Sequence, residues 1–328
     1  MSTPKAILIT AASGNIGTQL VPLLLSQNPP PKLVLPTRNA EKLRTAFPSI
    51  SKAGGNVVIP EGTVQDPIWF QSIIHDNHVD TVFLCLTGAD ELYSSLNGLD
   101  AITRAGTVKK VIFLSIIGDF TSDQGFKETM RTRAYPHLFA KVLIEQRLLN
   151  AEYPFEWTVL GPTLFFTNDN FMKAHIMQKG EITSLSKHGV NKISLSDIAL
   201  AVRNVAYDTS GAWNRKKIQL GTERLFTGAE ITRLWSEALG KPLKPGYATK
   251  KAMAQVELGM RAAYQSSVEG MQLARSRRIV HEYLEDYGMS MSESEYEEQV
   301  KLLGKEPDSY ELFVKETAQK WLSDESAA

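Results

Sequence analysis

Residues 10–17 read Thr-Ala-Ala-Ser-Gly-Asn-Ile-Gly and lie between a short apolar run, Ile7-Leu8-Ile9, and a longer apolar stretch. The spacing fits the pattern G-x-x-G-x-x-G, with Ala11 in the first glycine place. In such a turn Gly14 lets the backbone approach a pyrophosphate, Gly17 lets the next helix pack against the strand, and the N–H groups at the helix start face the phosphates. The turn predicts a dinucleotide site, with a structural turn or a degenerate site as the alternative. The expected contacts are Thr10, Ala12, Ser13, Gly14, Asn15, Ile16 and Gly17.

A second pair of residues indicates which dinucleotide binds. NAD-binding domains usually place Asp or Glu at the end of the second strand, about 20 residues after the glycine turn, where it holds the ribose hydroxyls. Here the strand ends in Thr37-Arg38 without an acid, and Arg38 is a natural partner for a 2′-phosphate. Lys42 lies one helical turn further on, and Glu41 between them could tether either side chain. The pattern favours NADP(H) over NAD(H). The alternative is that Arg38 and Lys42 are only solvated side chains at a helix start.

Short apolar runs alternate with longer helical patterns in the first half of the chain, which is typical of strands buried on both faces. The predicted strands are Ala6–Thr10, Leu33–Pro36, Val57–Pro60, Thr81–Leu86, Val111–Ser115 and Trp157–Leu160. The predicted helices are 15–26, 39–46, 67–77, 91–105 and 136–150. Alternation of this kind implies right-handed crossovers. We therefore predict an α/β fold, a doubly wound and mostly parallel Rossmann sheet with a smaller, mainly helical C-terminal lobe.

The pattern changes after residue 165. Ser196-Asp197 and the capping box of Thr227 and Glu230 predict helix starts, Lys217–Leu220 predicts another strand, and the last third is mostly helical. We predict two domains. They are an NADP-binding domain of residues 1–165, joined by strands near 190–222, and a helical lobe of residues 166–328 for a substrate or a partner.

The composition argues against several classes of protein. Lys plus Arg number 36 and Asp plus Glu number 36, and a net charge of zero does not favour binding to nucleic acid or an anionic membrane. No run approaches the length of a membrane-spanning helix, and the first apolar run is too short for a signal peptide. The lone Cys85 cannot form an internal disulfide, and no Cys or His has metal-ligand spacing. We expect a cytoplasmic protein without a metal site.

The sequence resembles the NmrA-like group of atypical short-chain dehydrogenase/reductase proteins over nearly its whole length. The segments that carry the resemblance are the Gly14–Gly17 turn, Arg38–Lys42, Val108–Ser115, His137–Lys141 with Glu145, Trp157–Pro162 followed by Asn168, Ser196–Ala199 and Leu303–Tyr310. The family has two functional branches, and the resemblance implies both. Some members are NAD(P)H-dependent reductases of small molecules, and others bind NADP(H) without turnover and regulate partner proteins.

The resemblance also points to residues near the nicotinamide. Typical short-chain dehydrogenases use Tyr-x-x-x-Lys, in which the Lys holds the nicotinamide ribose and the Tyr transfers the proton. Lys141 keeps the Lys place, whereas His137, one turn earlier on the same helical face, takes the Tyr place. His137 is therefore a candidate proton donor, because histidine can act as an acid near neutral pH; the alternative is that it only packs. Tyr135 is a second candidate donor, and Ser115, at the end of the fifth strand, is a further catalytic candidate.

Three other strand ends supply expected cofactor contacts, since parallel strands turn their carboxyl ends to one edge. These contacts are Thr63 and Val64 at the adenine, Leu86 and Thr87 at the adenine-side ribose, and Pro162 and Thr163 along the carboxamide. Phe165 and Phe166 are expected to form a wall of the substrate pocket.

Together these features predict an NADPH-dependent oxidoreductase that reduces an apolar small molecule, such as a quinone, an enone or a secondary-metabolite intermediate. The alternative is a non-catalytic NADP(H)-binding redox sensor that docks onto a protein partner. A weaker alternative is a non-redox isomerase or cyclase on the same scaffold. A homodimer is compatible with each function.

Overall fold

The structure, a computed structural model, describes residues 4–48, 50, 56–88, 90–132, 136–183, 186–246, 250–263 and 267–326. Seven strands form the main sheet. They are β1 (Ala6–Ile9), β2 (Lys32–Val34), β3 (Val57–Val58), β4 (Thr81–Leu84), β5 (Lys110–Leu114), β6 (Glu156–Pro162) and β10 (Lys216–Leu220). The six strands predicted in the first half of the chain and the one predicted near 217 are all present.

The strand order is β10-β6-β5-β4-β1-β2-β3, and every neighbouring pair is parallel. The chain winds from β1 outward to β3, crosses back to β4 on the other side of β1, and winds outward to β10. In open α/β sheets, ligands bind where the winding reverses, at the carboxyl ends of the strands. The order confirms the predicted doubly wound fold. The winding reverses between the neighbouring strands β1 and β4, so the switch point lies at their carboxyl ends.

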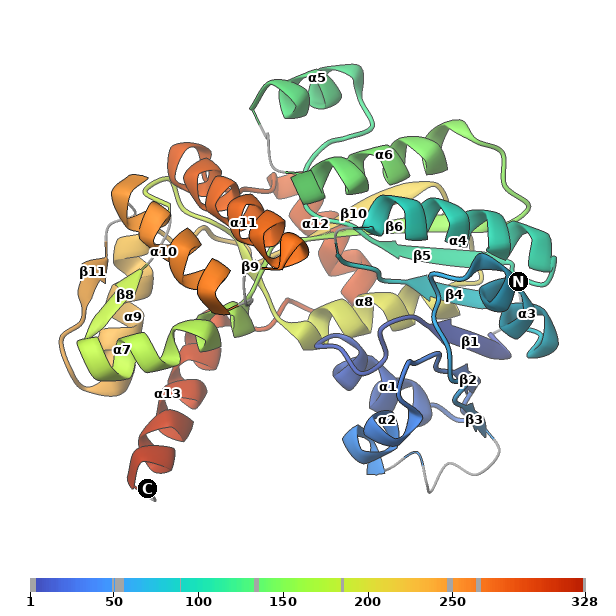
Figure 1. Cartoon of the computed structure of the whole chain (residues 1–328), viewed down its shortest axis with the longest axis horizontal. Helices are drawn as coiled ribbons and strands as arrows, with labels where there is room; N and C mark the ends of the chain where they lie inside the picture. Colours follow the sequence, from blue (N-terminus) through green and yellow to red (C-terminus); the bar gives the residue numbers. More distant parts are fainter. Residues whose placement is uncertain are drawn as a thin grey trace.

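Helices cover both faces of this sheet because its strands are apolar on both sides. Within β1, Ile7 and Ile9 pack into one apolar cluster and Leu8 packs into the other. The helices on the first face are α1 (Gly17–Leu25), α2 (Ala40–Ala46) and α8 (Leu195–Tyr207), and those on the second are α3 (Pro67–Asp76), α4 (Glu91–Ala105) and α6 (Pro136–Asn150) (Figure 1). The predicted helix starts at Asp66-Pro67 and at Thr227 are confirmed, the latter with its capping box.

The helical lobe lies beside the carboxyl ends of the sheet (Figure 1). Its elements are the 3-10 helix η3 (Phe166–Met172), α7 (Lys173–Lys179), α9 (Gly228–Leu239), α10 (Lys250–Ala263), α11 (Val268–Tyr287), α13 (Tyr310–Ser326) and the strands β7 (Leu164–Phe165), β8 (Glu181–Thr183), β9 (Lys192–Ile193) and β11 (Lys244–Gly246). Of the strands expected near 190–222, β10 joins the main sheet, whereas β9 pairs with β7. Helix α5 (Asp123–Thr132), which projects from the top of Figure 1, was not predicted.

A buried charged group organises the core of the lobe. The Asp169 carboxylate accepts hydrogen bonds from Lys192 Nζ at 2.6 Å, from Trp235 Nε1 at 3.1 Å and from the Tyr310 hydroxyl. All four side chains are buried. Because each polar atom has a partner, the group joins η3, β9, α9 and α13 without leaving a buried charge unpaired.

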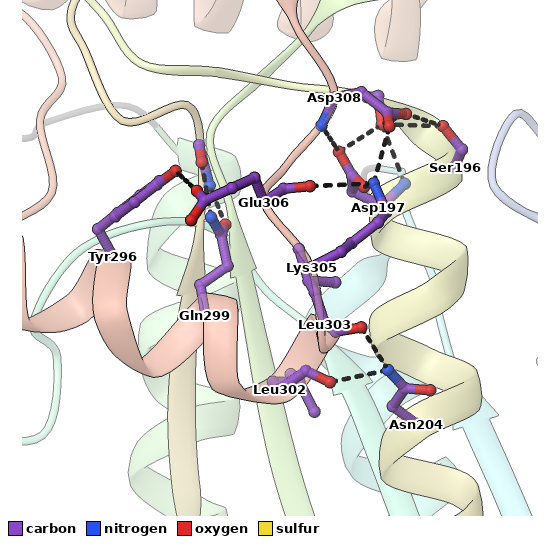
Figure 2. Close-up of polar contacts among 12 residues, drawn as sticks. Ser196, Asp197, Asn204, Tyr296, Gln299, Leu302, Leu303, Lys305, Glu306 and Asp308 are labelled. Atoms are coloured by element: carbon purple, nitrogen blue, oxygen red, sulfur yellow. Dashed lines mark hydrogen bonds and ion pairs between the residues drawn. The ribbon is translucent and has the colours of Figure 1, made fainter.

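Helix α12 (Glu293–Leu303) and the segment after it fasten the end of the chain to α8 (Figure 2). The fully buried Asp197 carboxylate accepts from Lys305 Nζ at 2.6 Å and from the Asp308 N–H at 2.7 Å. Two turns further along α8, Asn204 donates to the carbonyls of Leu302 and Leu303 at 2.7 and 3.2 Å. Because α8 also packs on α1, these contacts connect the C-terminal segment, through α8, to the helix that follows the glycine turn.

Candidate nucleotide-binding site

The glycine turn leaves β1 at the switch point of the sheet. Ala11 has the left-handed φ of 53°, and the Gly14 N–H donates to its carbonyl at 2.9 Å. A Cβ at Gly14 would lie 3.1 Å from that carbonyl oxygen, and a Cβ at Gly17 would lie 2.5 Å from the carbonyl carbon of Ala12. The close approach of the backbone to itself therefore requires a glycine at position 17 and favours one at position 14.

The start of α1 is open to a ligand. Its N-cap residue, Ile16, makes no side-chain capping bond, whereas Asp66 caps α3 by accepting from the N–H groups of Ile68 and Trp69. The first N–H groups of a helix have no partner inside it, so an uncapped start can bind phosphate oxygens. Thr10 has a different task, since its hydroxyl accepts from the Cys85 N–H at 2.7 Å and links β1 to β4.

Arg38 and Lys42 are both exposed, and neither forms an ion pair with a residue in the described ranges. The expected tether from Glu41 is not formed. The Asn39 side chain accepts from the Lys42 N–H at 2.8 Å, and Glu61, beyond β3, accepts from the Ala40 N–H at 3.1 Å. The backbone of this turn is thus fixed while the two cationic side chains keep their charge available for an anion.

Lys141 lies on α6 and reaches the carboxyl end of β5. Its Nζ atom lies 2.5 Å from Glu91 Oε1, donates to the Leu114 carbonyl at 3.2 Å and stands 5.5 Å from the centre of the Phe113 ring. Glu91 belongs to the first turn of α4. Burial raises the pKa of the Glu91 carboxyl above its ordinary value, and Lys141 opposes that shift. The pair joins the start of α4, just after the β4 loop, to α6.

Ser115 follows β5 and belongs to a second buried polar chain. Its hydroxyl donates to the Glu145 carboxylate, whose two oxygens accept from Lys217 Nζ at 2.9 and 3.0 Å. Glu145 is 1% exposed, and burial raises the pKa of its carboxyl while Lys217 lowers it. Glu145 and Lys141 are four residues apart, so both point from α6 toward the sheet.

No role was predicted for Glu91, Glu145 or Lys217. A partial signal was present for Glu145, because an acid four residues after Lys141 must share its helical face. Glu91 carried only the weaker signal of an acid in the first turn of a helix. Lys217 lies in a distant strand, and the parallel pairing of β10 with β6 brings it to Glu145.

The other expected cofactor contacts lie along the same carboxyl edge. Val64 and Leu86 are half-buried beside the second apolar cluster, and Thr87 is exposed. Thr63 donates to Gln65 at 3.2 Å. Thr163 is 5% exposed, and its hydroxyl has no partner in the described part of the chain. A buried hydroxyl of this kind fits a site completed by a ligand; Pro162, before it, uses its carbonyl to accept from the Ile117 N–H.

The two phenylalanines after β6 diverge. Phe165 is half-buried against the main-sheet cluster. Phe166 is 2% exposed and packs in the core of the lobe, with ring centres 5.3 Å from Tyr310 and 5.4 Å from Phe313. Because β7 ends at Phe165 and η3 begins at Phe166, the two side chains lie in different apolar clusters, and their place in a pocket wall stays a prediction.

The two candidate proton donors fall wholly or partly outside the described residues. Tyr135 lies outside the described residues. His137 lies in the first turn of α6, four residues before Lys141, but its side chain is also outside the described set. Their roles stay predictions.

An apolar seam joins the carboxyl edge to the lobe. Ile116 and Ile117, just after β5, contact residues of α11. The α11 residues in these contacts are Val280, Tyr283 and Leu284. Half-buried side chains such as Ile116, Leu164 and Met291 border the same seam. The surroundings of Lys141 and Ser115 on this side are therefore mainly apolar.

The described ranges lack two further features. They contain no cluster of three or more His, Cys, Asp or Glu side chains with the geometry of a metal site. Within the same ranges, every helix is too short or too polar to cross a membrane.

Comparison with known proteins places the chain in a family. The sequence model of the NmrA-like family matches residues 3–311. The chain belongs to the NmrA-like family. A search of curated protein sequences found no match.

Solved structures share the fold of this NmrA-like protein at low sequence identity. The NADPH-dependent quinone oxidoreductase of Escherichia coli, in complex with NADPH, has a TM-score of 0.73 at 15% identity, over 95% of this chain and 99% of that one. Triphenylmethane reductase of Citrobacter sp., in complex with NADP(H), has 0.71 at 19%, over 95% and 99%. NmrA, a negative transcriptional regulator in complex with NADP, has 0.68 at 16%, over 100% and 98%. The fold is thus common to reductases and to a regulator.

Proposed function

We propose that this protein is an NADPH-dependent reductase of an apolar small molecule. The observation that carries the proposal is the uncapped glycine turn at the switch point, with two unpaired cations at the end of the next strand. Gly14 and Gly17 allow the approach of a pyrophosphate, and Arg38 and Lys42 would bind the 2′-phosphate. When bound, NADPH supplies a hydride.

The remaining side chains of the site have separate tasks in this proposal. Lys141 would contact the nicotinamide ribose from the end of β5, and the unpartnered Thr163 hydroxyl would bind a polar group of the cofactor. The seam beside Ile116 and Tyr283 suits an uncharged, aromatic substrate. Aromatic substrates agree with the quinone and the triphenylmethane dyes named for two structural neighbours.

Titration with NADPH and with NADH, followed by energy transfer from tryptophan to the reduced nicotinamide, tests the cofactor. A panel of quinones, enones and triphenylmethane dyes, followed by loss of nicotinamide absorbance, tests turnover. Tight NADPH binding with turnover of a panel member supports the reductase. Failure to bind either nucleotide contradicts the whole proposal.

A second candidate is an NADP(H)-binding regulator that docks onto a protein partner. Two observations favour it. Lys141 is already neutralised by Glu91, and α11 packs directly over the residues that follow β5. NADPH binding without turnover of any panel compound, together with a partner whose affinity differs between NADP and NADPH, would support this function over the first.

A further inference from the structure

A cavity at the outer edge of the main sheet meets the buried chain that ends at Ser115. The cavity has a volume of about 270 Å³ and lies between β10 and α6. Its lining includes Glu145, Lys217, Trp157, Arg215 and Glu298. Two of these, Glu145 and Lys217, are the inner members of the Ser115 chain, so the cavity reaches buried groups that the proposed cofactor site does not use.

The hydrogen bonds run without a break from this cavity to the carboxyl end of β5. Lys217 Nζ donates to both oxygens of Glu145, and the Ser115 hydroxyl donates to one of them. Ser115 follows Leu114, whose carbonyl accepts from Lys141 Nζ. The inner end of the chain therefore lies beside the lysine assigned to the nicotinamide ribose, and its outer end lies at the cavity.

We propose that Ser115, Glu145 and Lys217 form a proton path from this cavity to the substrate. The path rests on the proposed reductase, because reduction of a carbonyl consumes one proton for each hydride. Ser115 is the catalytic residue of the path, and Glu145 and Lys217 are positioning residues that restore its proton.

Each turnover takes one proton from water in the cavity and delivers one proton to the substrate. The O–H bond of Ser115 breaks as an O–H bond forms on the substrate oxygen, which has gained its electron pair through the hydride. Glu145 then gives a proton to the Ser115 oxygen, after taking one from the Lys217 ammonium. Water in the cavity returns a proton to Lys217, so the protein ends in its starting state.

The surroundings of Glu145 suit a group that both gains and loses a proton. Burial raises the pKa of its carboxyl, and the charges that oppose this are Lys217 on β10 and Lys141 on α6, with a further contribution from the Ser115 hydrogen bond. Arg215 and Glu298 line the cavity outside this pair. A carboxyl between these influences can hold a proton at higher pH than an exposed one.

The decisive variant is Glu145→Gln, which keeps the size of the side chain and removes its acid. Glu298→Gln is the matched control, because Glu298 lines the same cavity and its ion-pair partner, Lys216 at 3.0 Å, lies outside the Ser115 chain. We expect Glu145→Gln to lower turnover on the order of a hundredfold, to raise the solvent deuterium effect because proton supply becomes the slow step, and to leave the NADPH dissociation constant unchanged. The control should match wild type. Wild-type turnover and isotope effect in Glu145→Gln would overturn the path.

Infrared titration of the carboxyl band gives a readout that needs no turnover. A band lost in Glu145→Gln should titrate in wild type and exchange quickly in deuterated water, and Lys217→Met should shift its titration to higher pH. If wild type reduces no substrate, the proposed function fails while this band still decides the path. Fast exchange would support a path from the cavity, whereas a band that neither titrates nor exchanges would overturn it.

Discussion

The Nζ atom of Lys141 lies 2.5 Å from a carboxylate oxygen of Glu91, and the two side chains are only 9% and 3% exposed. Removing one member of a buried ion pair costs about 3–5 kcal/mol because it leaves the other charge uncompensated. We therefore expect Glu91→Gln and Lys141→Met each to lower the free energy of unfolding by about that amount. The double variant should lose less than the sum of the two. Urea denaturation of all four proteins measures the coupling, and additive losses would contradict it.

The same pair predicts how stability depends on pH. Burial raises the pKa of Glu91 in the folded protein, with Lys141 in opposition. A carboxyl with a raised pKa adds stability below its ordinary pKa and loses that contribution as pH rises through the raised value. The free energy of unfolding of wild type should thus fall relative to that of Glu91→Gln as pH rises through this range. Exposed Glu41→Gln is the control and should track wild type; equal pH profiles for all three proteins would refute the assignment.

Gly17→Ala should disrupt the turn, because the new Cβ would overlap the carbonyl group of Ala12. Overpacking of this kind costs about 1–3 kcal/mol, and the displaced backbone should also weaken NADPH binding. Gly259→Ala makes the same substitution in α10, where a Cβ meets nothing within 4 Å. It should leave binding unchanged and stabilise the protein by up to about 1 kcal/mol. Thermal unfolding and nucleotide titration check both variants, and normal binding by Gly17→Ala would be the contrary result.

Ala11→Gly should relieve strain in the same turn. An alanine at a φ of 53° bears a penalty of about 1–2 kcal/mol that glycine avoids, partly offset by the greater freedom of glycine in the unfolded chain. We expect a gain in stability of up to about 1 kcal/mol, with NADPH binding retained. Ala46→Gly, at the end of α2, should instead lose stability. A destabilised Ala11→Gly protein would show that the methyl group packs favourably.

Arg38→Ala and Lys42→Ala should separate the two nucleotides. Each removes an exposed cation whose side chain forms no ion pair within the described part of the chain, so we expect little change in the stability of the folded protein. A hydrogen bond to a charged group is worth about 1.5–3 kcal/mol, which corresponds to a loss of NADPH affinity of roughly ten- to a hundredfold. NADH affinity should not change. Arg44→Ala, on the same helix, is the control, and equal losses for NADPH and NADH would remove the case for a 2′-phosphate site.

The sequence alone was sufficient to predict the elements whose apolar residues follow a clear helix or strand spacing. The helices predicted at about 91–105 and 136–150 are present as α4 and α6, because their apolar spacing is clear. Helix α5 was missed because only Thr129 of its ten residues is buried. Phe165 and Phe166 were treated alike because the directions of their side chains depend on where β7 ends. That strand has only two residues, so no sequence pattern marks it.

Contacts between distant segments were the main part of the site that could not be predicted. Glu91 meets Lys141, and Lys217 meets Glu145, across 50 and 72 residues of chain. Nothing local in the sequence records these pairings, because they follow from the order of strands in the finished sheet. The glycine turn and Arg38 were found because their chemistry depends on local spacing.

The place of β10 also sets the order in which this protein can be assembled during synthesis. The strand that covers the outer edge of β6 is residues 216–220, yet the glycine turn is complete by residue 17. A nascent chain therefore contains the glycine turn long before the strand that pairs with β6 is made, and a fragment ending near residue 165 would expose the outer edge of β6 to other chains. A chain in which the outer edge of β6 is paired therefore includes the first part of the lobe.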